Sequence, residues 1–255
     1  MDFSWLDERI TDAICKFWTT RDDGQGVLAG KTLDAFVDII EKTVIDSGLV
    51  NAKAYTGRNT SQLPGFFRPH KSWDVVVIDN GKLIAAVEFK SQVGSIGNNF
   101  NNRTEEVLGS SLDLQTAIEE CAFGDDANIF TGYIIVVEDG PASRATPSIN
   151  MSFFPVMSGF LLDETTRNSS YAQRSDSTYP RATGVSYITR YDIMCKRLMM
   201  KGLYTATALI TAPKNQPIDG TYTSISAQTS IQTFMLKLAN HCEVVHNINI
   251  QNTNP

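Results

Sequence analysis

Residues 73–90, WDVVVIDNGKLIAAVEFK, constrain the fold of this chain more than any other stretch. Two apolar runs flank an Asp-Asn-Gly sequence, which is typical of two β-strands joined by a tight turn. The first run begins directly after Asp74, and the second ends in Glu88 and Lys90. Strands this apolar are expected to be buried, so three charged residues at one end of the hairpin need a reason.

The length of the turn decides which charged side chains share a face of the hairpin. Side chains alternate along a strand, so Glu88 and Lys90 project together. A two-residue turn at Asn80-Gly81 would place Asp74 on the opposite face. A three-residue loop shifts the register by one residue and brings Asp74 to the face of Glu88 and Lys90. We predict the three-residue loop, since such loops commonly place glycine in a left-handed conformation.

In that register two carboxylates and one ammonium lie close together at the end of a sheet. Adjacent carboxylates repel unless a positive charge lies between them. Mg²⁺ is bound through one or two carboxylates, waters and substrate phosphates, so Asp74 and Glu88 are predicted metal ligands. Lys90 could hold a water or offset negative charge on a phosphate in the transition state. The alternative is a surface salt bridge at a strand end, which contributes little.

Composition excludes several classes of protein. The chain has 255 residues, of which 42% are hydrophobic and 20% charged, as in an ordinary globular protein. The longest apolar runs are too short to span a bilayer, and the acidic N-terminus does not resemble a secretory signal. The four cysteines are widely separated and predict neither a disulfide framework nor a zinc site. We therefore expect a cytoplasmic protein that does not enter membranes.

The distribution of charge is more informative than its sum. The net charge of −6 argues mildly against a polyanionic partner. Residues 47–73, the first acid-free segment, and residues 193–217, the second acid-free segment, contain lysine and arginine but no aspartate or glutamate. They could line a positive groove, or they could be two solvated basic faces.

Hydrophobic periodicity predicts an α/β fold with a mixed sheet flanked by helices. Helices are expected at about residues 5–17, 33–46, 103–120, 189–200 and 231–240, and a buried strand at 130–137. We expect irregular structure over residues 47–73, 98–102 and 163–183, and a frayed tail over residues 247–255.

Several longer motifs carry a family resemblance. They are LPGFFRP (63–69), K-x-WDVVV (71–77), AAVEFKS (85–91), GNNFNNRTEE (97–106), FTGYIIVVED (130–139) and SYITRYDIMCKRLMMKG (186–202). The D…E-x-K hairpin resembles the PD-(D/E)xK nuclease superfamily, with Trp73 in place of proline. Together the motifs resemble the XhoI family of type II restriction endonucleases. The resemblance implies a restriction-endonuclease-like fold and one domain over residues 1–255, with a loop insertion at about 161–183 and a poorly matching C-terminal segment from about 205.

The resemblance also implies an activity. It implies a Mg²⁺-dependent homodimer that cuts double-stranded DNA at 5′-CTCGAG-3′, leaves 5′ overhangs and has a companion DNA methyltransferase. Asp74, Glu88 and Lys90 fall on the family's catalytic positions. Glu41 is a candidate for a further catalytic acid on the preceding helix, with Asp38 as the fallback, although a solvated helix position explains Glu41 equally well.

Reading CTCGAG requires donors for guanine and a donor–acceptor pair for adenine, which arginine and asparagine supply. The predicted base-reading residues are Asn98, Asn99, Asn101, Asn102 and Arg103. The asparagines could instead cap the following helix and build turns. The predicted phosphate contacts are Arg68, Lys71, Arg190, Lys196 and Arg197, and the role of Arg181 is left open.

Two other functions remain open at this point. The same hairpin could serve a repair or junction-resolving nuclease that recognises DNA structure rather than sequence. Alternatively, the chain could be a sequence-specific DNA-binding protein without catalytic activity, although the intact Asp74, Glu88 and Lys90 count against this.

Overall fold

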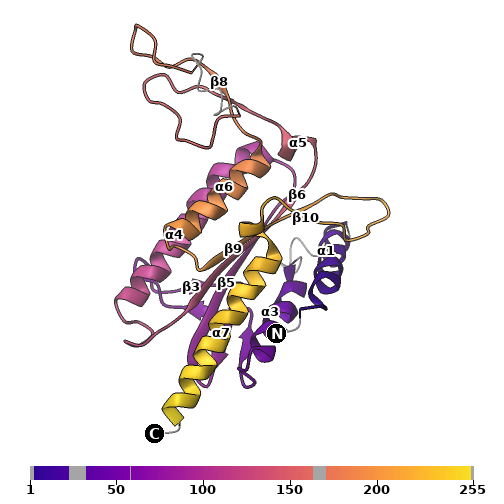
Figure 1. Cartoon of the computed structure of the whole chain (residues 1–255), viewed down its shortest axis with the longest axis vertical. Coiled ribbons are helices and arrows are strands. Elements are labelled where there is room, and N and C mark those ends of the chain that lie inside the picture. Colours follow the sequence, from indigo (N-terminus) through magenta and orange to yellow (C-terminus); the bar gives the residue numbers. More distant parts are fainter. Residues whose placement is uncertain (1–2, 23–32, 58, 163–170, 254–255) are drawn as a thin grey trace.

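The computed structural model of the chain describes residues 3–22, 33–57, 59–162 and 171–253 (Figure 1). Arg58 of the first acid-free segment and residues 163–170 of the predicted loop lie outside these ranges. Within them, no helix is both long enough and apolar enough to cross a membrane.

A six-stranded mixed sheet forms the centre of the molecule, with strand order β1-β4-β5-β6-β9-β10. The strands are β1 (Lys53–Tyr55), β4 (Val75–Asp79), β5 (Lys82–Gln92), β6 (Phe130–Glu138), β9 (Ala206–Ala212) and β10 (Thr223–Ser224). The central strands β5, β6 and β9 are parallel, whereas β1, β4 and β10 join antiparallel at the edges. The predicted α/β fold with a mixed sheet is confirmed.

Helices cover both faces of this sheet (Figure 1). On one face lie α1 (Leu6–Asp22), α3 (Ala35–Asp46) and α7 (Ile231–Thr253), and on the other lie α4 (Ile96–Glu119) and α6 (Tyr187–Met200). Each face has its own apolar core, because the strand side chains alternate between the two layers. Phe89 packs in the first core, while Ala86 packs in the second, next to the charged end of β5.

The remaining elements are short. They are β2 (Gln62–Leu63), β3 (Lys71–Ser72), α5 (Pro141–Arg144), β7 (Ser148–Ile149), β8 (Ala182–Thr183) and the 3₁₀ helix η2 (Ala227–Thr229). β2 and β3 form a small hairpin within the first acid-free segment, and β1 adds an edge strand to the main sheet. The prediction of wholly irregular structure over residues 47–73 was therefore wrong.

Two helix boundaries also differ from the predictions. The predicted loop over residues 98–102 is helical, because α4 begins at Ile96, directly after a turn with positive φ at Gly94 and Ser95. Ile96 and Phe100 are both buried, and this four-residue spacing favours a helix over the turn preference of the asparagines. At the C-terminus α7 continues to Thr253, so the tail is not frayed over residues 247–253.

The β4–β5 turn is shorter than predicted, but Asp74 still lies on the same face as Glu88. Asp79 pairs with Lys82, so Asn80 and Gly81 form a two-residue turn, with φ values of 47° and 80°. The three-residue loop was wrong. Further along, Val77 pairs with Ala85 while Ile78 pairs with Leu83, so Ile84 is an extra residue in a β-bulge. The bulge shifts the register by one residue and places Asp74 on the face of Glu88.

Candidate active site

Asp74, Glu88 and Lys90 converge at the end of the β4–β5 hairpin. The Lys90 ammonium lies 2.7 Å from Glu88 Oε1 and 4.0 Å from Asp74 Oδ2. Strand β5 fixes Glu88 and Lys90 on one face, and the bulged register brings the residue before β4 to the same face. The structure therefore brings together the three residues that the sequence analysis selected.

Asp74 is held by the backbone of the neighbouring strand. Its Oδ2 accepts a hydrogen bond of 2.7 Å from the N–H of Phe89. The side chain is 45% exposed, so it remains open to a ligand. Partial burial raises the pKa of Asp74, while the Lys90 ammonium and the Phe89 N–H oppose that effect.

Glu88 is buried, with 4% of its surface exposed, and it lies between two lysines. Lys90 contacts Oε1, and the Lys71 ammonium lies 3.4 Å from Oε2. Burial acts to raise the pKa of Glu88, but the two ammonium groups outweigh it, and the pKa lies below its ordinary value. Oε2 is buried and its nearest cation among the described residues is Lys71, so a metal ion at this atom would have to compete with that ammonium.

Lys71, a predicted phosphate contact, belongs to the carboxylate cluster, and its contact with DNA stays a prediction. Its side chain is only 13% exposed, and its ammonium lies 4.2 Å from the centre of the Trp73 ring. Burial lowers the pKa of Lys71, and Glu88 opposes this shift. The site therefore contains two lysines and two carboxylates. No local spacing in the sequence marks the second lysine, because Lys71 reaches Glu88 from β3.

A hollow of about 490 Å³ lies beside these residues. It is lined by Arg68, Glu88, Lys90, Arg103, Glu105, Glu106, Gly109 and Ser110. Arg103 is paired with Glu106 at 2.5 Å, and Arg68 is paired at 2.5 Å with the buried Asp113 of α4. Two predicted DNA-binding arginines therefore lie at the same hollow as Glu88 and Lys90.

The four predicted asparagines lie on the first turns of α4 rather than in a loop. Asn98, Asn101 and Asn102 are exposed, and Asn99 is half-buried. None of them caps the helix, since α4 begins at Ile96, before the first of them. Their role in reading bases stays a prediction, now for one face of a helix that leads to Arg103.

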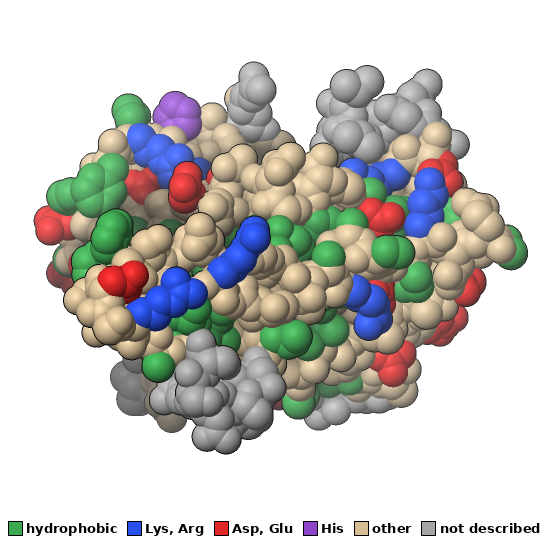
Figure 2. Space-filling view, turned by 90° about the horizontal axis from the view of Figure 1, so that it is seen from above, with side chains coloured by type: hydrophobic (Ala, Val, Ile, Leu, Met, Phe, Trp, Pro, Cys, Tyr) green, Lys and Arg blue, Asp and Glu red, His purple; other side chains and the backbone are tan. Residues whose placement is uncertain are grey.

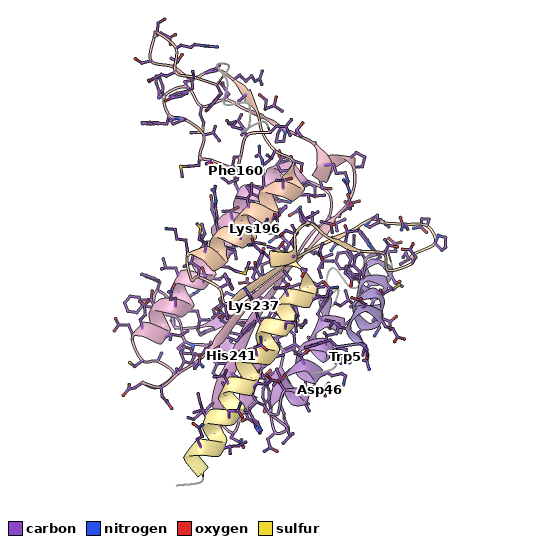
Figure 3. The ribbon with its side chains drawn as sticks, in the orientation of Figure 1. Trp5, Asp46, Phe160, Lys196, Lys237 and His241 are labelled. Carbon is purple, nitrogen blue, oxygen red and sulfur yellow. The ribbon has the colours of Figure 1, made fainter. Side chains whose placement is uncertain are left out.

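Three other predicted phosphate contacts lie on α6, away from the carboxylate cluster. Arg190 donates to the carbonyl of Val185, and Lys196 pairs with Asp192 at 2.7 Å. Arg197 donates to the Ser158 carbonyl and stacks over the Phe160 ring; Figure 3 labels Lys196 and Phe160. Arg181, whose role was open, donates to Ser148 Oγ at 2.6 Å. These cations have intramolecular partners, and their contact with DNA stays a prediction.

On the face seen from above, the described Lys and Arg side chains form no single continuous patch (Figure 2). Lys and Arg side chains lie in separate groups there, and acidic side chains stand beside several of them. The net charge of this face therefore does not indicate where DNA binds, and the contacts of individual residues are the better guide.

Glu41 does not join the carboxylate cluster in the structure. Its Oε1 accepts a hydrogen bond of 3.0 Å from the Ala54 N–H of β1, so it satisfies a donor on an edge strand. Asp38, the fallback residue, is exposed on α3. A catalytic role for either acid stays a prediction. A Glu41→Gln variant would test it, because glutamine keeps the acceptor and removes the charge.

Two buried tyrosines near Glu88 were missed by the sequence analysis. Tyr133 pairs with Glu88 in the β5–β6 register, and Tyr204 precedes β9. Burial raises the pKa of both hydroxyls, and the Glu88 carboxylate adds to the effect. Asp113, which anchors Arg68, was also missed. Only the three-dimensional fold brings these residues together, so no spacing in the sequence identifies them.

The arrangement is suited to a hard divalent cation rather than to zinc. No group of three or more His, Cys, Asp or Glu side chains that could hold a metal occurs in the described ranges. Two carboxylates alone are the protein ligands that Mg²⁺ commonly uses, with waters and phosphates completing its shell. The partly exposed Asp74 and the Oε2 of Glu88, for which the Lys71 ammonium would compete, therefore fit Mg²⁺ beside the hollow.

Comparison with known proteins identifies the class. A sequence model of the family described as "Restriction endonuclease XhoI" matches residues 18–177 and 159–224. The type II restriction enzyme XhoI of Xanthomonas vasicola is 35% identical over 239 residues, covering 88% of each chain. The type II restriction enzyme BstVI of Geobacillus stearothermophilus is 33% identical over 221 residues, covering 84% of this chain and 88% of the relative.

A third relative, the type II restriction enzyme AbrI of Azospirillum brasilense, is 48% identical over 115 residues, covering 45% of this chain and 52% of the relative. No solved structure matches the chain. The protein is a type II restriction enzyme, that is, a site-specific deoxyribonuclease that binds DNA. It belongs to the XhoI family, and the resemblance seen in the sequence is confirmed.

Proposed function

We propose that this enzyme is a Mg²⁺-dependent homodimer that cuts both strands of 5′-CTCGAG-3′ in double-stranded DNA and leaves 5′ overhangs. The observation that carries the proposal is the convergence of Asp74, Glu88 and Lys90 beside a hollow lined by two arginines. The recognition sequence is the one implied by the family. It requires guanine and adenine contacts, which Arg103 and the exposed asparagines of α4 can make.

Each residue of the cluster has a role in hydrolysis of the phosphodiester bond. Asp74 and Glu88 would hold Mg²⁺, which supplies Lewis acidity at a phosphate oxygen and lowers the pKa of a bound water. The Phe89 N–H orients Asp74, and Lys71 and Lys90 keep Glu88 ionised. Lys90 also faces the hollow, where its ammonium stabilises negative charge that develops on the phosphate. The resemblance of the hairpin to the PD-(D/E)xK pattern supports these roles.

The palindromic site supports a two-fold dimer with one active site for each strand. A cell that contains this activity needs a companion methyltransferase to protect its own DNA. The cytoplasm is the proposed location, because the substrate is there and all four cysteines are free thiols.

Digestion of a sequenced plasmid with one CTCGAG site tests the proposal directly. We expect one linear product with Mg²⁺, none with EDTA, and 5′ overhangs at CTCGAG when the ends are sequenced. The matched control is the same plasmid with the central CG changed to GC. Sedimentation should give twice the mass of the chain, and plasmid methylated within CTCGAG should resist cutting.

The two alternative functions predict different results in the same assay. A repair or junction nuclease would cut branched or damaged DNA and leave the intact plasmid uncut or randomly cut. A non-catalytic binding protein would shift a CTCGAG duplex without cutting it at any Mg²⁺ concentration. Either result would overturn the proposed activity.

A further inference from the structure

The loop between β2 and β3 displays two adjacent aromatic side chains. Phe66 is 51% exposed and Phe67 is 68% exposed. Their rings contact each other edge to face, with centroids 5.0 Å apart and an interplanar angle of 81°. Two contiguous exposed phenylalanines form an apolar patch, and this patch lies next to Arg68, a residue that lines the hollow.

The loop is anchored to helix α4 by hydrogen bonds. Asp113 of α4 accepts hydrogen bonds from the Phe67 N–H at 2.9 Å and from Arg68 Nε at 2.5 Å. Gly65 packs so closely on the same carboxylate that an added Cβ would lie 2.6 Å from Asp113 Oδ2. These contacts hold the loop in one conformation with its rings exposed, so little entropy is lost when a ligand binds them.

The position and charge of the loop favour DNA as the ligand. The next residue, Arg68, lines the hollow that contains Glu88 and Lys90, and Lys71 of the same hairpin reaches Glu88. The loop belongs to the first acid-free segment, residues 47–73, which carries basic but no acidic side chains. Arg68, Lys90 and Arg103 line the hollow near the two rings, where they can contact phosphates of a bound duplex. Aromatic side chains stack on bases or wedge between base steps of DNA.

We propose that Phe66 and Phe67 form a wedge that inserts at a base-pair step of the bound duplex, next to the scissile phosphate, and unstacks it. This inference rests on the proposed function, since it needs duplex DNA in the hollow. The exposed ring of Phe67 enters the stack and Phe66 supports it from the side. The distortion opens the duplex locally, which brings the phosphate towards Asp74, Glu88 and Lys90.

Fluorescence of 2-aminopurine, which rises when the base loses its stacking, tests the wedge. Duplexes carry the probe in place of the adenine of CTCGAG or at one flanking position, and they are bound by Lys90→Ala protein to prevent cutting. We expect a rise at one position, loss of the rise with Phe67→Ala, and its retention with Phe67→Tyr. Phe153→Ala is the matched control, because Phe153 is 74% exposed but lies in the segment before β8.

Cleavage kinetics give a second measurement in proteins that retain Lys90. Phe67→Ala should cut an intact site at least about tenfold more slowly, because no aromatic ring then offsets the free energy lost when the base step unstacks. A mismatch at the step identified by the probe should restore most of the rate, since that step is already unstacked. Phe153→Ala should behave as wild type on both substrates.

Several outcomes would overturn the wedge. One is the absence of a fluorescence rise at every position while anisotropy shows binding. Another is a rise that survives both Phe66→Ala and Phe67→Ala. If either variant instead halves the sedimenting mass and leaves the fluorescence unchanged, the rings contact a second copy of the chain. Failure of the proposed function is separable, because wild-type protein would then not cut CTCGAG with Mg²⁺, whatever the probe reports.

Discussion

The two acid-free segments look alike in the sequence but differ in the structure. In the first, residues 47–73, Lys71 contacts Glu88 and Arg68 lines the hollow beside it. In the second, residues 193–217, Lys196 pairs with Asp192 on the same helix, and Lys214 pairs with Asp22 of α1. Lys71 of the first segment therefore meets a carboxylate of the candidate active site, while Lys196 and Lys214 of the second pair with carboxylates elsewhere.

The difference follows from the elements that carry the charges. The first segment forms the β2–β3 hairpin and the edge strand β1. Strand β3 leads directly to Asp74 and β4, so its Lys71 can offset the negative charge of Asp74 and Glu88. The second segment begins on α6. Its Lys196 lines a separate hollow together with Lys237, which belongs to α7 (Figure 3). A run without acids therefore indicates positive surface, but only the fold decides whether that surface meets the site.

The largest effect is expected for Lys90, towards which both carboxylates converge. Lys90→Ala should lower the single-turnover cleavage rate by about 10³-fold or more, because charge developing on the phosphate is no longer stabilised. Anisotropy with a CTCGAG duplex should still show binding. Normal cutting by this variant would exclude the assigned site.

The next effect tests whether Lys71 acts with the carboxylates rather than as one more surface cation. Lys71→Met keeps the aliphatic stem and removes the charge 3.4 Å from Glu88 Oε2. We expect a cleavage rate about tenfold to a hundredfold lower. We also expect half-maximal rate at a lower Mg²⁺ concentration, because an ammonium no longer competes for the carboxylate.

Lys53→Met is the matched control, since Lys53 is an exposed cation of β1 in the same segment. Equal effects of the two variants would mean that the segment contributes only diffuse charge. The contact between Lys71 and Glu88 would then not distinguish the first segment from the second.

The geometry of the candidate active site was predicted best where the relevant spacing is local. Glu88 and Lys90 share a strand face because they are two residues apart, and the flanking apolar runs identified the hairpin. The position of Asp74 was predicted correctly for the wrong reason. Its register depends on a bulge at Ile84, and nothing in the apolar sequence around Ile84 marks an extra residue.

Contacts between residues far apart in the chain could not be predicted from the sequence. Lys71 and Asp113 reach the site from β3 and α4, and no spacing within either element reveals their partners. Strand β9 was missed because ATALITA is rich in small residues and lacks a period, although every residue in it is buried. It lies between β6 and β10 beneath helices on both faces, where alternation is not expected.

A moderate effect is expected at Asp113, which holds the loop of the first segment. Burial alone would raise the pKa of Asp113, but hydrogen bonds from Phe67 and Arg68 outweigh it and lower the pKa. Asp113→Asn should lower the free energy of unfolding by about 1–2 kcal/mol at pH 7, since the half-exposed Arg68 limits the gain from the ion pair.

The pH dependence of that difference has a definite sign. Because the folded pKa of Asp113 lies below the unfolded value of about 3.9, its contribution is complete above that value and is lost as the pH falls through the folded pKa. Urea unfolding of both proteins should therefore show a constant gap from pH 7 to about 5, narrowing below about 4. A gap that widens in acid would contradict the assigned ion pair.

The smallest effect is expected in the second segment. Lys196→Ala removes an ammonium that is already 2.7 Å from Asp192, so few phosphate contacts should be lost. Lys214→Ala, which breaks the pair with Asp22, is the matched control. Each variant should change the cleavage rate by about twofold or less, with no change in the salt dependence of binding. If Lys196→Ala alone reduces the slope of log K against log salt by about one, Lys196 leaves Asp192 for a phosphate when DNA binds. The second segment would then take part in DNA binding as the first does, and the ion pair seen in the free enzyme would be an exchangeable substitute for the DNA backbone.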